Sequence, residues 1–163
     1  MKRIAPAFAL ASMLASPAMA ANLPARAVGL WQSVTTVTGP DGQPLPNAAN
    51  VVTVYCVDQM NDQKFFTSNQ SACSSLTISG SGSNYSIDGV CQGAGRIHET
   101  LVYADSKNLQ LTAVYDGKVG HTTLTSQFQW QGACLPGMQA GDEGNISGGV
   151  FSKTDNINDT ANQ

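Results

Sequence analysis

The residues that could carry acid–base or metal chemistry are sparse in this sequence. It contains two histidines in 163 residues, His98 and His121. His98 precedes Glu99 in an alternating stretch, and neighbours on a strand point to opposite faces, so they do not form a catalytic pair by themselves. His121 follows the turn signal Asp116-Gly117 and is expected at an exposed hairpin end. Neither histidine belongs to a metal-binding motif, so we predict no metal and no cofactor.

Nucleophiles and carboxylates give no stronger indication of catalysis. The serines are numerous, but none occurs in the G-x-S-x-G pattern that exposes a nucleophile on a strand-to-helix turn. Most of the acids lie where a turn or a helix cap explains them. We therefore predict no catalytic residues, and a hydrolase assembled from distant serines and acids is the weakest functional hypothesis.

The cysteines indicate structural disulfides rather than catalysis or metal binding. The four are Cys56, Cys73, Cys91 and Cys134, and no two of them form a C-x-x-C motif. This spacing excludes the thioredoxin-type redox motif and the common zinc-ligand pair. An even number of cysteines in an exported chain indicates two structural disulfides.

The first 20 residues predict export. A positive start, Met1-Lys2-Arg3, precedes the short apolar stretch 4–14 and the small-residue site Ala18-Met19-Ala20. This is the pattern of a secretory signal peptide cleaved after Ala20, which predicts a periplasmic or secreted protein. The sequence has no apolar segment long enough to span a membrane.

Charge excludes one class of partner. Removal of Lys2 and Arg3 with the signal peptide changes the formal net charge from −3 to −5, and the remaining cations are scattered. A nucleic-acid binder needs a dense basic surface, so we set that class aside.

The elements that would position any site are predicted to be β-strands. Apolar residues recur with a period of two, and turn residues such as Asp116-Gly117 separate the runs. This pattern predicts an all-β antiparallel meander that curls into a barrel or half-barrel, with a short helical turn after the second strand. The predicted strands lie near residues 28–37, 51–57, 75–79, 85–91, 96–104, 109–115 and 122–134.

Four cysteines can form two disulfides in three different pairings. The face of the strand on which each cysteine lies helps to choose between these pairings, because successive side chains of a strand alternate between its two faces. In the last run, Cys134 shares a face with Trp130, and Cys91 also lies on the apolar face of its strand. Cys73 has the opposite parity, so a Cys73–Cys91 bridge would require a β-bulge. We therefore favour Cys56–Cys73 and Cys91–Cys134.

The chain divides into three parts by composition. Residues 1–20 are the signal peptide, residues 21–134 the disulfide-linked β domain, and residues 135–163 a polar segment rich in Gly, Asn and Asp. The last part shows no sustained period and is predicted to be a flexible tail, apart from a brief strand at residues 149–151.

The order of short motifs resembles a known family. Gly29-Leu30-Trp31-Gln32, the successive cysteines and a closing Trp130-x-Gly132-x-Cys134 are similar to a bacterial periplasmic family of unknown function, numbered 3617 in the DUF series. The resemblance covers residues 27–134, although Gln32 replaces the usual acid and the polar tail is not typical. It implies a secreted, disulfide-bearing β domain without established catalytic residues.

Two non-catalytic functions remain. The first is a binding module that holds a small apolar ligand or an envelope component on the aromatic inner face, with Trp31, Tyr85, Phe128 and Trp130 facing the ligand. The second is a protein-interaction module, an inhibitor or assembly factor, that contacts an envelope protein. It would use the Gln/Thr face of the last run and the proline-rich loop 39–50.

Overall fold

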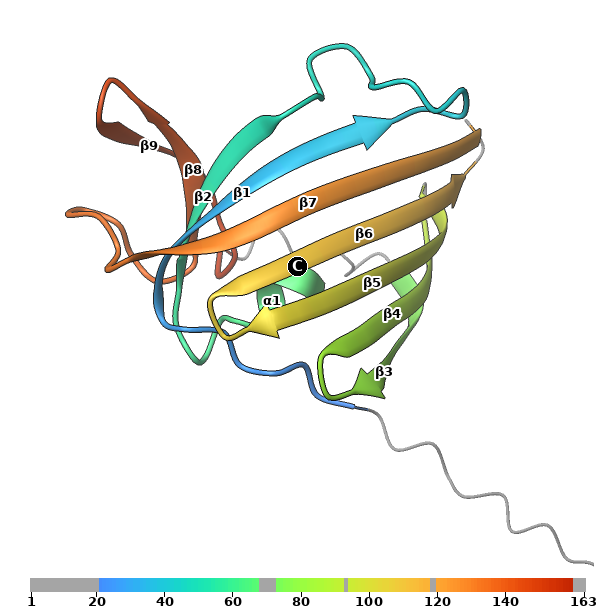
Figure 1. Cartoon of the computed structure of the whole chain (residues 1–163), viewed down its shortest axis with the longest axis horizontal. Helices are drawn as coiled ribbons and strands as arrows, with labels where there is room; N and C mark the ends of the chain where they lie inside the picture. The colour runs from blue at the N-terminus through green and yellow to red at the C-terminus, as the bar shows by residue number, and fades with distance from the viewer. Residues whose placement is uncertain (1–20, 68–72, 93, 118–119, 160–163) are drawn as a thin grey trace, which may run out of the picture.

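The computed structural model describes residues 21–67, 73–92, 94–117 and 120–159, so the predicted signal peptide lies outside the described residues. In these residues one antiparallel sheet has the strand order β3-β4-β5-β6-β7-β1-β2-β8-β9 (Figure 1). The strands are β1 (Gly29–Thr38), β2 (Val51–Val57), β3 (Cys73–Ser81), β4 (Asn84–Cys91), β5 (Gly95–Asp105), β6 (Asn108–Gly117), β7 (Gly120–Gly132), β8 (Asp142–Ser147) and β9 (Val150–Asn156).

The predicted antiparallel meander is confirmed. Strands β3 to β7 follow one another as paired neighbours, and β1 joins the sheet beside β7. The sheet is curled like a half-barrel (Figure 1). It does not close, because β3 and β9 are its two edges and do not pair with each other.

The predicted helical turn after the second strand is also present. It is α1 (Lys64–Thr67), which lies in the hollow of the curled sheet (Figure 1). The carboxylate of Asp58 accepts the main-chain N–H of Asn61 at 2.8 Å, so it caps the chain just before α1. Phe66 of α1 packs against the concave side of the sheet in one buried cluster: Phe66, Ile87, Leu101, Tyr103 and Leu109. The concave face is therefore the core of the domain.

Strand parity separates the two faces of β7 as the sequence predicts. Ser126 is buried and Phe128 packs against the core cluster, whereas Gln127 and Gln129 are exposed on the convex side. The alternation follows from the pleat of a strand, in which successive side chains leave on opposite faces.

The predicted disulfide pairing is wrong. The bridges are Cys73–Cys91 and Cys56–Cys134. The register shifts between Cys73 and Ser75, and this bulge brings Cys73 opposite Cys91 despite its parity. Cys134 lies beyond the end of β7 at Gly132, where φ is +126°, so the parity of the strand does not extend to it.

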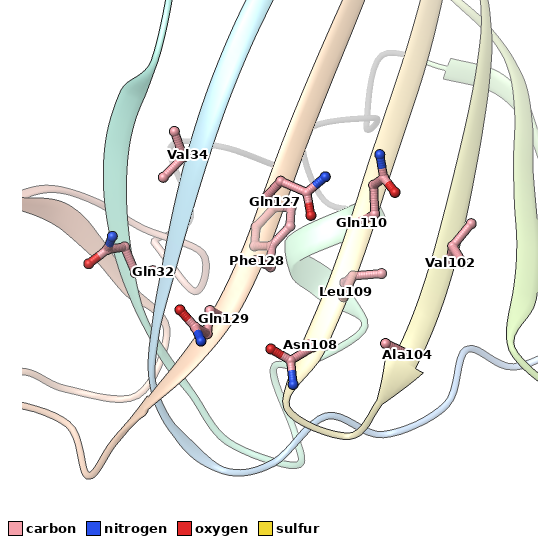
Figure 2. A pocket seen from close by; sticks show the side chains of 10 residues that line it. All are labelled: Gln32, Val34, Val102, Ala104, Asn108, Leu109, Gln110, Gln127, Phe128 and Gln129. Atoms are coloured by element: carbon pink, nitrogen blue, oxygen red, sulfur yellow. The ribbon is translucent and has the colours of Figure 1, made fainter.

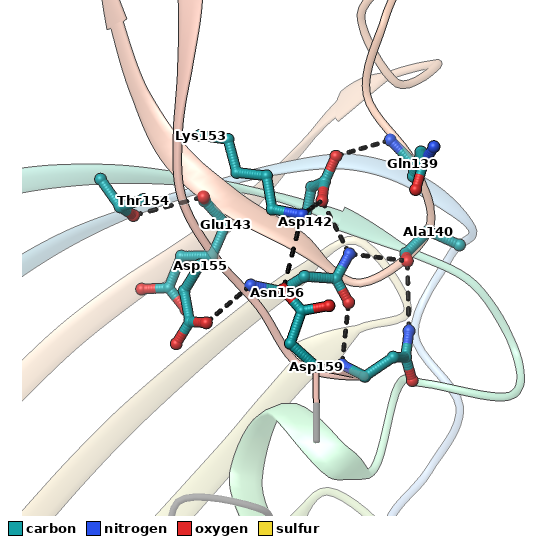
Figure 3. Close-up of polar contacts among 10 residues, drawn as sticks. Gln139, Ala140, Asp142, Glu143, Lys153, Thr154, Asp155, Asn156 and Asp159 are labelled. Atoms are coloured by element: carbon teal, nitrogen blue, oxygen red, sulfur yellow. Dashed lines mark hydrogen bonds and ion pairs between the residues drawn. The ribbon is translucent and has the colours of Figure 1, made fainter. Parts of the chain in front are cut away.

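The segment predicted as a flexible polar tail instead contains the hairpin β8–β9, which pairs with β2 through Val54 and Tyr55. Several polar contacts of the hairpin meet at Asp142, the first residue of β8, whose side chain is buried (3 % exposed). Its carboxylate accepts hydrogen bonds at 2.7 Å from the main-chain N–H of Gln139 and from the side-chain amide of Asn156 (Figure 3). Lys153 lies 3.0 Å from the same carboxylate. The brief strand predicted at residues 149–151 overlaps β9, but β8 and the rest of β9 were not predicted, because their sequence shows no sustained apolar period.

Candidate functional site on the concave face

A buried ion pair fills one part of the concave face. Arg26, which precedes β1, is 4 % exposed. Its Nε donates to Oδ1 of Asp62 at 2.5 Å, and its main-chain N–H donates to Oδ2 at 2.7 Å. Asp62 lies just before α1, so this pair fastens the segment before β1 to the helical turn inside the hollow.

Aromatic rings surround the Arg26 guanidinium. Its carbon lies 4.5 Å from the ring centre of Phe66 and 5.0 Å from that of Trp31. Phe65 and Phe128 lie at 5.6 and 6.0 Å. Cation–π attraction and the Asp62 carboxylate together compensate the loss of water around the charge. We call Arg26, Asp62 and α1 the plug.

Beside the plug lies a pocket of about 340 Å³, which we call the concave pocket. Its wall combines α1 with the inward faces of β5, β6 and β7 and the turn after β4. Most of the lining side chains are apolar or aromatic. The lining residues are Phe65, Phe66, Cys91, Gln92, Ala94, Ile97, Glu99, Leu111, Tyr115 and Leu124. This volume is at the lower end of the range typical for small-molecule sites, about 300–1,000 Å³.

Glu99 is the one charged side chain among the described residues that line this pocket. It is 6 % exposed and follows Ile97 with the period of two that places both on the concave face of β5. His98 and Thr100 lie on the opposite, convex side, so the predicted separation of His98 from Glu99 holds.

Tyr115 shares the pocket wall with Glu99. Burial raises the pKa of Tyr115 to about 12, and the negative charge of Glu99 contributes to the rise. The pocket therefore combines a carboxylate, a neutral phenol and apolar walls. The sequence analysis did not select Glu99 as a site residue. Its position on the same strand face as the apolar Ile97 and Leu101 was the feature that could have identified it.

A second groove of about 310 Å³ lies on the convex face, and half of its lining residues carry amide side chains (Figure 2). We call it the outer groove. Gln127 of β7 pairs with Gln110 of β6 on one side, and Gln129 of β7 pairs with Gln32 of β1 on the other. Figure 2 shows amide side chains along this groove, with the Phe128 ring behind the strand. Two of the amides predicted to face outward, Gln127 and Gln129, thus line this groove beside amides of the neighbouring strands.

The histidines lie apart from both hollows. Nδ1 of His98 is 2.7 Å from Asp88 Oδ1, and its Nε2 is 3.5 Å from the Thr100 hydroxyl. His121 lies 2.7 Å from the Asp116 carboxylate. The side chains in both His–Asp contacts are more than half exposed, and neither histidine lines the concave pocket or the outer groove. The residues that the structure describes contain no cluster of three or more His, Cys, Asp or Glu that could hold a metal ion.

The four residues predicted to face a ligand do not line the concave pocket. Trp31 is fully buried beneath Arg26, and its indole N–H donates to the Ala27 carbonyl at 2.7 Å. Tyr85 and Phe128 pack against the core cluster. The Trp130 ring lies 4.3 Å from Lys107 Nζ and is half-buried. The aromatic residues that do reach the pocket are Phe65, Phe66 and Tyr115.

Together these features define a class: a disulfide-linked, all-β domain with a plugged concave face. Within the described part of the chain, α1 has four residues, and no helix has the length and apolar character needed to cross a membrane.

The model of the family described as "Protein of unknown function (DUF3617)" matches residues 24–134, and the chain belongs to this family. No curated protein and no solved structure matches the chain. The matched region ends at Cys134, before the β8–β9 hairpin.

Proposed function

We propose that the protein is a non-catalytic binding module that holds a small apolar ligand in the concave pocket. The observation that carries this proposal is a hollow of about 340 Å³ whose walls are mainly apolar and aromatic. A concave apolar site with few polar groups is the usual setting for small-molecule binding. The outer groove has similar size, but half of its lining residues carry amide side chains.

We also propose that the protein works outside the cytoplasm, after cleavage of the signal peptide. The two disulfides support this proposal, because such bridges persist mainly in oxidising compartments. Ala21, the first residue after the predicted cleavage site, donates its main-chain N–H to the Ile78 carbonyl at 3.1 Å. The predicted mature chain would therefore begin directly beside the edge strand β3.

Native mass spectrometry of gently purified, exported protein tests the binding function. We expect a bound small molecule on the wild-type protein and its loss in Leu124→Trp, because the larger ring fills the concave pocket. Thr125→Trp is the matched control, since Thr125 is the next residue of β7 and is exposed on the convex face. A clean apo mass for the wild type, with no uptake of added 1-octanol, would contradict the proposal.

A second candidate function is protein interaction through the outer groove. It is supported by the amides on neighbouring strands β1, β6 and β7, which could hydrogen-bond an envelope protein; the glutamines of β6 and β7, Gln110, Gln127 and Gln129, are exposed. A photo-crosslinking residue at Gln127 should then trap one defined neighbour in cells. The same residue at exposed Ser152 of β9 is the control. Equal labelling from both positions would argue against this function.

A further inference from the structure

We propose that the outer groove binds a neutral oligosaccharide. This site is separate from the concave pocket, and a saccharide is the alternative to a protein partner in the same groove. The inference begins from the chemistry of the lining. Among the described residues that line the groove, half carry amide side chains and none is Asp, Glu, Lys, Arg or His. The five amide residues are Gln32, Asn108, Gln110, Gln127 and Gln129.

The strand register arranges these amides in two adjacent rows. Gln110 of β6 lies opposite Gln127 of β7. Gln129 of β7 lies opposite Asn108 of β6 on one side and Gln32 of β1 on the other. Neighbouring strands are about 4.8 Å apart, and residues two apart on one strand share a face at a spacing of about 7 Å. The sheet therefore holds the amide side chains in a regular lattice (Figure 2).

Three of the amides have their hydrogen-bonding groups available for a ligand. Among the described residues, no hydrogen bond within the chain engages the side-chain amides of Gln32, Gln110 and Gln127, and the last two side chains are exposed. The amides of Asn108 and Gln129 already contact neighbouring side chains. A side-chain amide carries two N–H donors and a carbonyl acceptor, whereas a hydroxyl both donates and accepts. One amide can thus bind two neighbouring sugar hydroxyls.

A row of threonines continues this surface beside the groove. Thr112 of β6 lies opposite Thr100 of β5 and Thr125 of β7. Thr36 of β1 completes the row beside Thr125. Each of these threonines is two residues away from a groove-lining residue of its own strand, so it shares the convex face. The row crosses four strands, about 14 Å, which suits a chain of sugars better than a single ring.

The position of the groove argues against a peptide. Extended peptides usually bind at a sheet edge, where main-chain groups are unpaired. The outer groove instead crosses β5, β6, β7 and β1, each of which pairs with a strand on both sides. Protein interfaces also centre on aromatic or arginine anchors. Among the described lining residues, the one aromatic side chain, Phe128, packs against the core cluster. The faces of sheets in other β folds do bind oligosaccharides.

The uncharged lining selects a neutral saccharide over an acidic one. None of the described lining residues is a cation that would pair with a carboxylate or a sulfate, and the formal net charge of −3 opposes an anion. Val34, Val102 and Ala104 also line the groove. Their apolar side chains can contact the C–H groups of sugar rings and exclude water from them.

A glycan array that carries neutral, uronate-containing and sulfated oligosaccharides, probed with labelled, exported protein, tests the inference. We expect binding to neutral oligosaccharides and none to the acidic ones. Gln127→Ala should weaken binding to the strongest neutral glycan by at least about fivefold, because it removes one or two hydrogen bonds. Asn145→Ala is the matched control. It removes an exposed amide of β8, outside the groove, and should leave the affinity within about twofold.

Absence of binding to every neutral glycan, a preference for acidic glycans, or an unchanged affinity in Gln127→Ala would overturn the inference. A single protein neighbour trapped from position 127, with no neutral glycan bound, would assign the groove to a protein instead. Leu124→Trp alters the concave pocket and not the groove, so its glycan binding should equal that of the wild type. Failure of the saccharide site therefore leaves the proposed ligand of the concave pocket standing.

Discussion

Arg26 and Asp62 form a two-point contact in which the main-chain N–H and the Nε of one residue both reach the carboxylate of the other. The contact joins the segment before β1 to the turn that carries α1. Because Phe65 and Phe66 of α1 line the concave pocket, this ion pair positions part of the pocket wall.

Replacement of Asp62 by Ala should lower the free energy of unfolding by about 3–5 kcal/mol, because it leaves the buried Arg26 cation without its partner. Urea denaturation followed by tryptophan fluorescence measures the change. The double variant Arg26→Met, Asp62→Leu should recover most of the loss, since it removes both charges. A loss below about 1 kcal/mol for the single variant would show that the pair is not the anchor of the plug.

The two disulfides should differ in their contribution to stability. The Cys56–Cys134 bridge spans 78 residues and the Cys73–Cys91 bridge spans 18. Restriction of the unfolded chain then contributes about 4.5 and about 3 kcal/mol, respectively. Urea denaturation of the two Cys-to-Ser double variants should show the larger loss for Cys56 and Cys134. The reverse order would mean that effects in the native state outweigh chain entropy.

Acid should weaken the β8–β9 hairpin through Asp142. Burial is the largest single influence on the pKa of Asp142 and raises it, but the contacts with Gln139, Asn156 and Lys153 outweigh it, so the pKa lies below its ordinary value of 3.8. The stabilisation is therefore complete above about pH 3.8 and is lost as the pH falls through the folded-state value.

Hydrogen exchange of the hairpin amides as a function of pH tests this expectation. In the wild type, the hairpin amides should be less protected from hydrogen exchange in acid than at neutral pH. In Asp142→Asn the hairpin should already be less protected at neutral pH and should change less on acidification. An identical acid dependence in both proteins would exclude Asp142 as the cause.

Alkali should destabilise the domain through Tyr115. Its pKa is raised from 10.0 to about 12, first by burial and then by Glu99, so the unfolded chain releases the phenol proton at lower pH than the folded one. The free energy of unfolding should consequently fall as the pH rises from about 10 to 12. Tyr115→Phe should reduce this fall, because Tyr55 and Tyr103, whose pKa values burial also raises, still contribute to it, and Glu99→Gln should reduce it to a smaller extent. A Tyr115→Phe variant with the same alkaline dependence as the wild type would contradict the assignment.

The sequence predicted the strands better than it predicted the site, for physical reasons. Period-two alternation follows from the pleat itself, so the inward face of β7 could be assigned from its residues. Parity fails where regular pairing is interrupted, as at the bulge after Cys73 and beyond Gly132. The disulfide pairing depended on these two interruptions, which are not visible as changes in the hydrophobic pattern.

The concave pocket could be predicted only in part. The inward position of Glu99 follows from its alternation with Ile97 and Leu101 on β5. The contribution of α1 could not be predicted, because it depends on the long-range contact between Arg26 and Asp62. That contact brings Phe65 and Phe66 into the hollow, whereas Trp31 and Phe128 are covered by the plug and the core.

Chemical-shift mapping of isotope-labelled, exported protein during titration with 1-octanol tests the central claim most directly. The account predicts saturable shifts at amides of the concave pocket, above all Glu99, Leu111 and Leu124. Amides of the outer groove, represented by Gln32, serve as the internal reference. Shifts that centre on the outer groove, or no saturable shift in the concave pocket with 1-octanol, would contradict a ligand site on the concave face.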